Sequence, residues 1–537
     1  MTTIAPYRSP AAPGKDGFTQ PLRAELTKFR TVRGWIIGAL VGVLAMAGVG
    51  LLASAGGQST CQSASGNSNG QGSTSSGNCV GHSFALGPGG GPVSDSFYFV
   101  RQPLAGDGSI TVRLTSLTGL LPSANSGGQS DNVPGVEAWA KAGLIIKENL
   151  SQGSAYAAIM VAADHGARMQ WNYTGDTAGL PGTVGPANPR WLRLTRSGDV
   201  ITGYDSADGT TWSQVGTATL AGLPSTAQVG LFAASPDDDQ TSQSFGGGTS
   251  TTGGGPTQDT AVFDRLSTSG GWRAGPWAGQ YVGSPEIPGV GGYHQSGGQF
   301  TLTGQGDIAP IPAGHGGPAD TAATVSDYLI GTFAGLLAIV VVAALFVTAE
   351  YRRGLIRTTF AATPSRGRVL AAKSVVVAVA GFIAGLLGAA IAVLPGEAIT
   401  RARGYYAFPV SAATEARVIV GTAILAAFAS VLALAIGTIV RRSAATVATV
   451  IVVIVLPYFF AEASVLPLSA GNWLLRIMPA AGFALQQVYP EYHQVTMLYA
   501  PFSGYFPLAP WAGLAVLAAW TAAALALAAY LLRRRDA

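Results

Sequence analysis

Six long apolar runs stand out along the chain, and a long polar stretch separates the first run from the second. A helix needs about 20 apolar residues to cross the hydrocarbon core of a bilayer, and each run is long enough. We therefore predict an all-α transmembrane domain of six helices. The runs lie at 35–55, 328–349, 375–394, 418–440, 445–466 and 511–532.

A cleaved signal peptide is the rival interpretation of the run at 35–55. The apolar region of a signal peptide is shorter, and a polar segment of more than thirty residues precedes this run. We therefore expect a retained helix. Pro457 interrupts the fifth run and predicts a kink there, because proline removes a helical hydrogen bond. The stretch after it, 468–509, is too broken to cross and predicts short helices or a re-entrant segment.

The polar stretch between the first two runs changes its composition twice. Residues 56–94 are rich in Gly and Ser and predict a tether. From 95 to 268, short segments rich in β-branched and aromatic residues alternate apolar with polar positions, as in "ITVRL" and "WLRLTR". This alternation indicates strands with one buried face, and their regular spacing favours an all-β sandwich. Residues 269–325 are expected to form a linker with accessory strands.

The basic residues predict the orientation of the helices, because Lys and Arg concentrate in cytoplasmic connections. With six spans, the amino-terminal flank, the 350–373 connection, Arg441-Arg442 and the final Arg triplet all fall on one side. Both termini are then cytoplasmic, and residues 56–325 are extracellular. Arg401, Arg403 and Arg417 fall on the other side but are outnumbered.

Composition excludes several classes of function. Only 11% of the residues are charged and 48% are hydrophobic, with a formal net charge of +4, so nothing indicates a nucleic-acid partner. There is no phosphate-binding loop motif, and the five histidines are scattered. We therefore predict no catalytic residue, no metal site and no cofactor on this chain.

Two short segments keep alternative interpretations open. Cys61 and Cys79 bracket a Gly- and Ser-rich stretch, and they form a disulfide if that stretch is extracellular or are otherwise two unpaired thiols. Asp237, Asp238 and Asp239 offer oxygen ligands for calcium, but they also fit an exposed acidic turn.

The connection "EYRRGLIRTTFAATPSRGRVLAAK" (350–373) concentrates six basic residues against one acid. A positive anchor beside anionic lipid would account for that charge. The remaining pattern resembles the connection of type-2 ABC transporter permeases. The candidate docking residues are Glu350, Arg352, Arg353, Gly354, Arg357, Thr358, Pro364, Arg366 and Lys373.

The segment "LRAELTKFRTVRGW" (22–35) resembles the interfacial elbow helix of the same family, with Glu25, Lys28, Arg30 and Arg33 as its charged residues. The elbow and the cytoplasmic tail before it would occupy residues 1–34. This resemblance implies a multi-pass permease of the bacterial plasma membrane that works as a homodimer or heterodimer. The loop would dock on a separate ATPase subunit, which would bind ATP and Mg²⁺, and the direction would be export.

The order of motifs in 95–268 resembles the concanavalin-like, laminin-G-like sandwich. Its segments are "WAKAGLIIKENLSQGSAYAAIMV", "PRWLRLTRSGDVITGYDSADGTTWSQVG", "VGLFAAS" and "AVFDRLS". Trp191 and Trp212 would be sugar platforms in such a domain, although we favour packing in its core. The alternative function is therefore a membrane-anchored carbohydrate-binding or sensory protein, for which a single span would suffice.

Overall fold

The chain forms two units, each built around its own core. The computed structural model describes residues 17–56, 84–122, 132–244, 248–273, 275–312, 322–362, 365–463, 465–488, 490–495, 499–501 and 504–534. The membrane unit comprises Met1–Gln58, Ala323–Val488 and Ala500–Ala537. The β unit comprises Ser59–Ala322 and Tyr489–Tyr499.

The membrane unit confirms the predicted six apolar helices. Six segments are long and apolar enough to span a bilayer: Arg33–Ala55, Asp327–Arg352, Arg366–Ala402, Ala412–Val440, Ser443–Glu462 and Pro510–Arg534. Helices and short turns have the bounds α1 Thr19–Thr31, α2 Arg33–Gly56, η2 Asp327–Leu329, α3 Thr332–Arg352, α4 Leu355–Ala362, α5 Arg366–Ala402, α6 Ala412–Val440, α7 Ser443–Val450, η3 Ile451–Val455, α8 Leu456–Glu462, α9 Leu468–Ile477, η4 Pro479–Gln486 and α10 Pro510–Arg534.

Two of the spans differ in detail from the predicted ones. α5 continues without a break through Pro395, so it is much longer than the apolar run that predicted it. The fifth span contains a π-helical turn, Ile451–Val455, directly before α8. Pro457 lies in the first turn of α8, where its missing N–H costs little, so the irregularity is a π-turn upstream of the proline.

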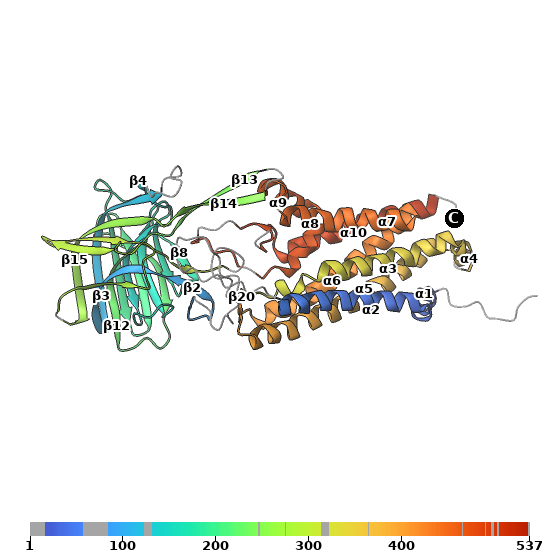
Figure 1. The fold of residues 1–537 in the computed structure, drawn as a ribbon, viewed down its shortest axis with the longest axis horizontal. Helices are drawn as coiled ribbons and strands as arrows, with labels where there is room; N and C mark the ends of the chain where they lie inside the picture. The colour runs from blue at the N-terminus through green and yellow to red at the C-terminus, as the bar shows by residue number, and fades with distance from the viewer. Residues whose placement is uncertain are drawn as a thin grey trace, which may run out of the picture. The chain divides into compact units, whose positions relative to one another are not determined.

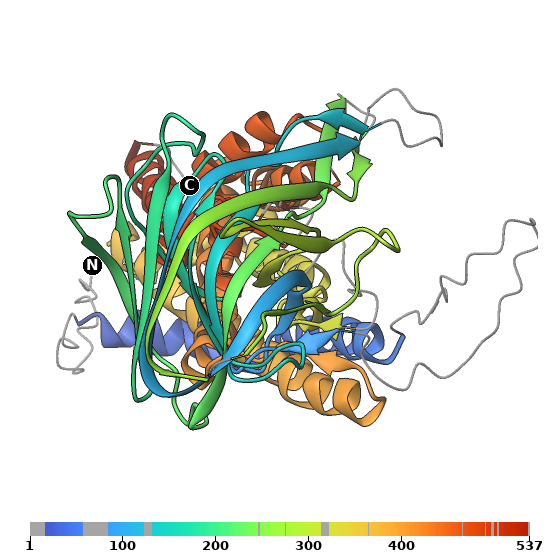
Figure 2. The same cartoon turned by 90° about the vertical axis from the view of Figure 1, so that its left-hand side faces the viewer.

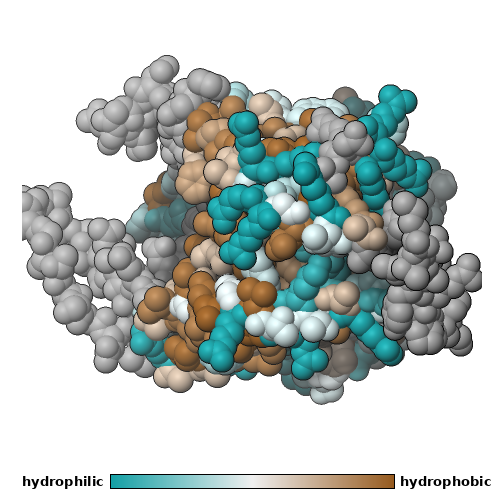
Figure 3. Space-filling view, turned by 90° about the vertical axis from the view of Figure 1, so that its right-hand side faces the viewer, coloured by the Kyte–Doolittle hydropathy of each residue, from teal (hydrophilic) through white to brown (hydrophobic). Residues whose placement is uncertain are grey.

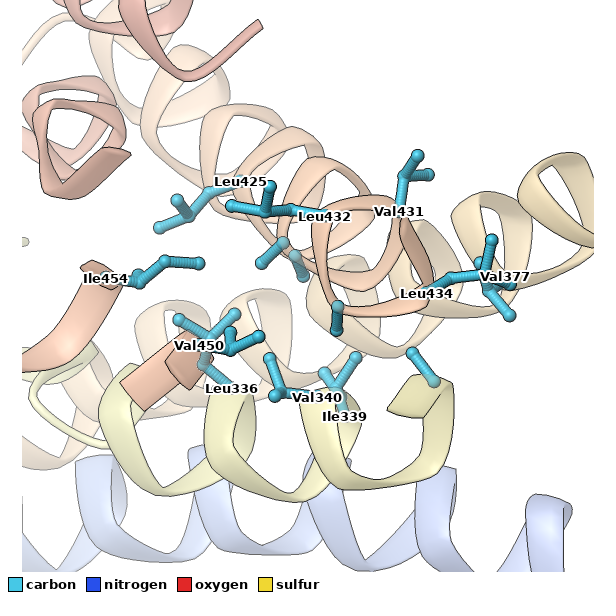
Figure 4. Packing of buried hydrophobic residues seen from close by; sticks show 14 of the residues in the cluster. Leu336, Ile339, Val340, Val377, Leu425, Val431, Leu432, Leu434, Val450 and Ile454 are labelled. Atoms are coloured by element: carbon cyan, nitrogen blue, oxygen red, sulfur yellow. The ribbon is translucent and has the colours of Figure 1, made fainter. Parts of the chain in front are cut away.

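The core of the membrane unit lies between α3, α5, α6 and the fifth span. Figure 4 shows Leu336, Ile339 and Val340 of α3 facing Leu425 and Leu432 of α6. Val450 and Ile454 of the fifth span close one side of this cluster, and Val377 of α5 lies at its far end (Figure 4). These side chains fix α3 and α6 as the buried centre of the unit, while the outer faces of α2, α5 and α10 stay exposed.

The β unit is antiparallel throughout its main sheet. Its fourteen strands follow the order β11-β10-β9-β3-β12-β5-β6-β7-β8, and β15, β16, β17, β18 and β4 pair outside this path. The strands are β1 Ala85–Leu86, β2 Pro92–Asp95, β3 Phe97–Pro122, β4 Asn132–Pro134, β5 Lys141–Lys147, β6 Tyr156–Ala162, β7 Gly166–Trp171, β8 Gly175–Ala178, β9 Arg190–Ser197, β10 Val200–Ser206, β11 Ser213–Thr219, β12 Thr226–Ala234, β13 Asp238–Ser244, β14 Gly248–Gly255, β15 Gln258–Trp272, β16 Ala278–Val282, β17 Gly292–Ser296, β18 Gln299–Gly304 and β19 Ile308–Pro310. Two further short strands are β20 Ala322–Ala323 and β21 Tyr406–Ala407.

One long bent strand, β3, organises the sheet. Where the sequence predicts two strands, the chain forms one, which pairs first with β12 and then with β9. Gly106 lies between these two pairings with φ of 73°, a conformation that glycine adopts without strain. β15 runs beside much of β3, and both curve together across the unit (Figure 2). The result is a β-sandwich that approaches a closed barrel.

Two apolar clusters lie on opposite faces of the central strands β5, β6 and β12. The larger cluster fills the inside of the curved sheet and includes Leu144, Ile159 and Leu231. The second includes Phe97, Phe99 and Ile145, which contact Val93, Val282 and Ile308 of the short strands β2, β16 and β19. The central strands are therefore buried on both faces, which explains their continuous apolar runs.

The predicted boundaries of the sandwich, 95 and 268, are narrower than the observed ones. Strands begin at Ala85 and continue to Pro310. Segments expected to be tether and linker supply β1, β2 and β16–β19. Local composition did not predict these strands, because they are short and are stabilised by the apolar face that they cover.

We predict that a fragment spanning 84–312 is soluble and β-rich, whereas a fragment cut at 95 and 268 aggregates. The shorter fragment lacks the strands that cover Phe97, Phe99 and Ile145, and it exposes the edge of β15 that pairs with β18. Size-exclusion chromatography and circular dichroism of the two fragments test this. A monomeric shorter fragment, or a helical spectrum of the longer one, would contradict it.

Candidate functional site

Lys373 is the buried centre of an ion cluster that joins three helices. Its Nζ lies 2.7 Å from Glu25 Oε2 of α1 and 2.6 Å from Glu350 Oε1 of α3. Lys373 itself lies in the second turn of α5, and its side chain is 2% exposed. Four residues that the sequence singled out from two distant segments, including Lys28, thus meet at one place.

Lys28 completes the cluster and balances its charge. Its Nζ lies 2.9 Å from Glu25 Oε1 and 3.2 Å from Glu350 Oε1, so two cations face two carboxylates. Partial burial of Lys28 lowers its pKa, but hydrogen bonds and charge attraction from Glu25 and Glu350 outweigh that effect and raise the pKa above its usual value. Lys28 therefore remains charged at neutral pH.

Aromatic packing beside the ion cluster joins α1, α2 and α3. The ring of Phe346 on α3 contacts Phe29 of α1 edge-to-face, with centroids 5.7 Å apart, and Trp35 of α2 at 5.9 Å. Lys373 Nζ lies 4.8 Å from the centroid of the Phe346 ring. Phe346 was not predicted as a site residue, because a phenylalanine inside an apolar run carries no signal of its own.

Glu350 lies at the point where α3 leads into the exposed helix α4. The chain turns at Arg353-Gly354, and Gly354 has φ of 69°. A side chain at 354 would meet open space, but this left-handed backbone is costly for most residues other than glycine. Gly354 therefore sets the direction in which α4 leaves the ion cluster.

α4 buries one side and exposes the other. Ile356 is buried, whereas Leu355, Arg357 and Thr358 are exposed, as are Arg352 and Arg353 before the turn. The hydroxyl of Thr358 donates to Leu355 O at 2.8 Å, which closes the first turn of the short helix. The exposed residues of α4, together with Arg352 and Arg353 before the turn, form what we call the α4 face. This face combines an exposed apolar residue, Leu355, with three exposed arginines.

Two further basic residues, Arg366 and Arg441, make contacts between helices at the α4 end of the membrane unit. α1, α4 and the C-terminus lie at the same end (Figure 1). Figure 3 looks onto it and shows hydrophilic side chains over its centre with hydrophobic ones around them. Arg366 Nη1 donates to Leu532 O of α10 at 2.5 Å, and Arg441 lies 5.0 Å from the Tyr351 ring. The C-terminal ends of α6 and α10 thus contact residues of the 350–373 connection.

The remaining predicted site residues have different positions. Arg30 and Arg33 are exposed and do not join the cluster. Pro364, Cys61 and Cys79 lie outside the described residues, so the disulfide stays a prediction.

The acidic segment and the tryptophans of the β unit do not form the predicted features. Asp237 follows β12, Asp238 begins β13, and the side chain of Asp239 is not described. Within the described ranges, no group of three or more His, Cys, Asp or Glu residues could hold a metal. Trp191 and Trp212 are half-buried outside the apolar clusters, and Arg113 and Arg193 lie over their rings at 5.7 and 3.8 Å. The favoured core packing of these tryptophans is therefore wrong, because both lie on the outward side of the sheet.

The arrangement is suited to transmitting movement between helices. Breaking a buried ion pair leaves an uncompensated charge in a low-dielectric environment. Displacement of α1, α3 or α5 alone would separate Lys373 from at least one carboxylate. The cluster therefore opposes displacement of any one of the three helices relative to the other two.

Comparisons with known proteins give one match over most of the chain. A family model described as "ABC-2 family transporter protein" matches residues 29–537. None of the curated proteins searched matches the chain.

Among solved structures, similar chains include a functionally unknown protein from Saccharomyces cerevisiae (TM-score 0.20, 16% identity, covering 33% of this chain and 76% of that chain). Another is scytalido-glutamic peptidase with a transition state analog inhibitor (TM-score 0.23, 11% identity, covering 41% of this chain and 100% of that chain). A third is sheep galectin-11 in complex with glycerol (TM-score 0.15, 10% identity, covering 26% of this chain and 92% of that chain). At these low TM-scores, none of the three carries an argument here.

We predict that Lys373→Met destabilises the full chain by about 3 kcal/mol or more, because it leaves two buried carboxylates with one half-exposed cation. The midpoint of thermal unfolding in detergent, followed by tryptophan fluorescence, should fall by about 6 °C or more.

Lys28→Met is the matched control, since its side chain is 41% exposed and surface pairs contribute about 1 kcal/mol or less. Combining Lys373→Met with Glu25→Gln and Glu350→Gln should restore much of the loss, because no buried charge then remains unpaired. Equal midpoints for Lys373→Met and the wild type would rule out a structural role for the cluster.

Proposed function

The chain belongs to the ABC-2 family of transporter proteins, and from that premise we propose that it is the permease subunit of an ATP-driven exporter. Its α4 face docks on a separate ATPase subunit that binds ATP and Mg²⁺. Two permease subunits form the transport path between them. The α4 end faces the cytoplasm, as the concentration of Lys and Arg at this end favours.

One observation supports this proposal: the exposed helix α4 follows directly after a buried, charge-balanced cluster that joins α1 to the membrane-spanning helices α3 and α5. Coupling between ATP hydrolysis and transport requires that a distant site respond to a change of contacts at the docking surface. A loop that served only as a lipid anchor would need its charge but no defined geometry. Burial of Lys373 between Glu25 and Glu350 supports the coupling role, because a lipid anchor gains nothing from it.

The chemistry of the α4 face suggests the shape of its partner. Leu355 is 48% exposed, and the exposed residues Arg352, Arg353 and Arg357 lie within three positions of it in the sequence. An apolar residue with a basic rim fits a cleft with an apolar floor and acidic edges, since such interfaces combine a buried anchor with complementary charge. We therefore expect the docking cleft of the ATPase subunit to carry Asp or Glu at its rim.

The β unit follows the first span and would be extracellular. Its concanavalin-like identity rests on the order of its sequence motifs and remains part of the proposal. A role as a carbohydrate-binding anchor has less support, because arginines lie over both tryptophans that would have offered sugar platforms. We propose that the β unit serves the transporter at the outer side of the membrane.

The decisive experiment changes the geometry of the turn and leaves its charge unaltered. Gly354→Val forces a β-branched residue into a left-handed conformation, which costs at least 1–2 kcal/mol. Substrate-stimulated ATPase activity of the reconstituted complex should fall by about tenfold, and co-purification of the ATPase subunit should weaken. Insertion and abundance in the membrane should stay unchanged.

Gly354→Asn is the control, because asparagine adopts the left-handed conformation with little strain. This variant should retain most of the coupling. If Gly354→Val couples as well as the wild type, the docking role fails and the lipid-anchor interpretation stands.

A further inference from the structure

Lys147 and Asp95 form an ion pair in the β unit that is closed off from solvent. Lys147 is the last residue of β5 and Asp95 is the last residue of β2, and both side chains are 0% exposed. Lys147 Nζ lies 2.7 Å from Asp95 Oδ2, and the rings of Tyr156 and Tyr173 lie 5.9 and 5.8 Å from the same Nζ. An amine and a carboxyl group are thus held in contact away from bulk water.

The two oxygens of the Asp95 carboxyl group have different surroundings. Oδ2 accepts hydrogen bonds from Lys147 Nζ, from the hydroxyl of Tyr173 at 2.7 Å and from Gly153 N at 2.8 Å. Oδ1 is buried and has no hydrogen-bond partner among the described residues. Donors are therefore concentrated on one oxygen, which prepares that oxygen to gain protons and leave.

The backbone fixes the N–H group of Gly153 against Asp95. Gly153 has φ of 81°, and a Cβ atom at this position would lie 2.1 Å from Leu86 O. Only glycine fits such a left-handed conformation and so close an approach. The orientation of the Asp95 carboxyl group is therefore set by the fold.

The hydroxyl of Tyr173 contacts both groups of the pair. It lies 3.2 Å from Lys147 Nζ and 2.7 Å from Asp95 Oδ2, and Ser154 O at 3.0 Å is its alternative acceptor. A hydroxyl can accept one hydrogen bond while it donates another. Tyr173 is thus placed to accept a proton from the amine and to pass its own proton to the carboxyl oxygen.

The surroundings of Lys147 favour the nucleophilic form of its amine. Burial lowers the pKa of Lys147, and the attraction of Asp95 offsets only part of that effect. A neutral amine has the lone pair that attacks a carboxyl carbon, and desolvation is one way in which proteins activate lysine.

We propose that Lys147 and Asp95 condense to form an intramolecular amide bond, with the ion pair as the starting arrangement. One proton passes from Nζ to Oδ2, which leaves an amine and a carboxylic acid. Nζ then attacks the carboxyl carbon, which is one bond away from the oxygen that it already contacts. Tyr173 takes a second proton from Nζ and gives its own proton to Oδ2. The bond between the carbon and Oδ2 breaks, one water molecule leaves, and Oδ1 becomes the amide oxygen.

Burial favours the product of this reaction. Two charges in a low-dielectric environment are costly, and the amide bond replaces both with a neutral group. The bond would tie β2, near the start of the β unit, to the central strand β5. It would also close a loop that contains β3, and a closed loop restricts the unfolded chain in the way that a disulfide does.

The pair at the other end of β5 offers an internal comparison. Lys141 Nζ lies 2.5 Å from Asp307 Oδ1, but the side chain of Asp307 is 15% exposed. We expect this pair to remain ionic, because solvent reaches its carboxylate. Both pairs are independent of α4, so a failure of the proposed amide bond would leave the proposed coupling untouched.

The test is mass spectrometry of the full chain, purified in detergent, then denatured and digested. An ion pair does not survive denaturation, whereas an amide bond does. We expect a branched product that joins the peptide containing Asp95 to the peptide containing Lys147. Its mass should be lower than the sum of the two separate peptides by one water molecule.

Three variants identify the groups that react. Lys147→Arg keeps a cation beside Asp95 but should abolish the branched product, because the guanidinium stays protonated. Lys141→Arg is the matched control at the other end of β5 and should leave the product unchanged. Tyr173→Phe keeps the ring and removes the hydroxyl, so the linked fraction at a fixed time after pulse-labelled synthesis should fall by about tenfold or more.

The wild-type digest decides the proposal without relying on any variant to fold. If it yields only separate linear peptides with Asp95 and Lys147, the pair is ionic and the proposal is overturned. A branched product that joins Lys141 to Asp307 instead would overturn the assignment of the site. An unchanged linked fraction in Tyr173→Phe would overturn the role of Tyr173 in proton transfer.

Discussion

A lysine buried between two carboxylates is the constraint on which the proposed working end of this protein depends. Lys373 contacts Glu25 and Glu350, and these three residues come from α5, α1 and α3. None of the charges is tolerable alone in an apolar environment, so each helix is held in place by the other two. The exposed α4 follows Glu350 after a turn of a few residues. Its position is therefore determined by contacts inside the membrane unit, before any partner docks.

The buried lysines of the β unit follow the same rule for buried charge. Lys141 and Lys147 are the first and last residues of β5, and each forms an ion pair with an aspartate. The Lys147–Asp95 pair also receives the hydroxyl of Tyr173 at 2.7 Å, which satisfies part of the carboxylate.

Much of the architecture was accessible from the sequence. Six apolar runs predicted six helices, and alternation predicted the main strands from β3 to β15. The predictions were wrong where the local sequence pattern does not reflect the position of a segment or side chain in the folded unit. The strands β1, β2 and β16–β19 lie in Gly-rich segments, so composition indicated tether and linker. Trp191 and Trp212 are large and aromatic, which suggested core packing, but both lie outside the apolar clusters, with arginines over their rings.

The sequence by itself determined the properties that depend on residues close together in the chain. These are the lengths of the helices, the alternation of apolar and polar residues in the strands, and the concentration of arginines between the second and third spans. Which charges meet was decided only by the tertiary structure. Glu25 and Lys373 are 348 residues apart along the chain, yet they lie 2.7 Å apart in space. Buried charge pairing is a long-range requirement, and local periodicity carries no information about the partner.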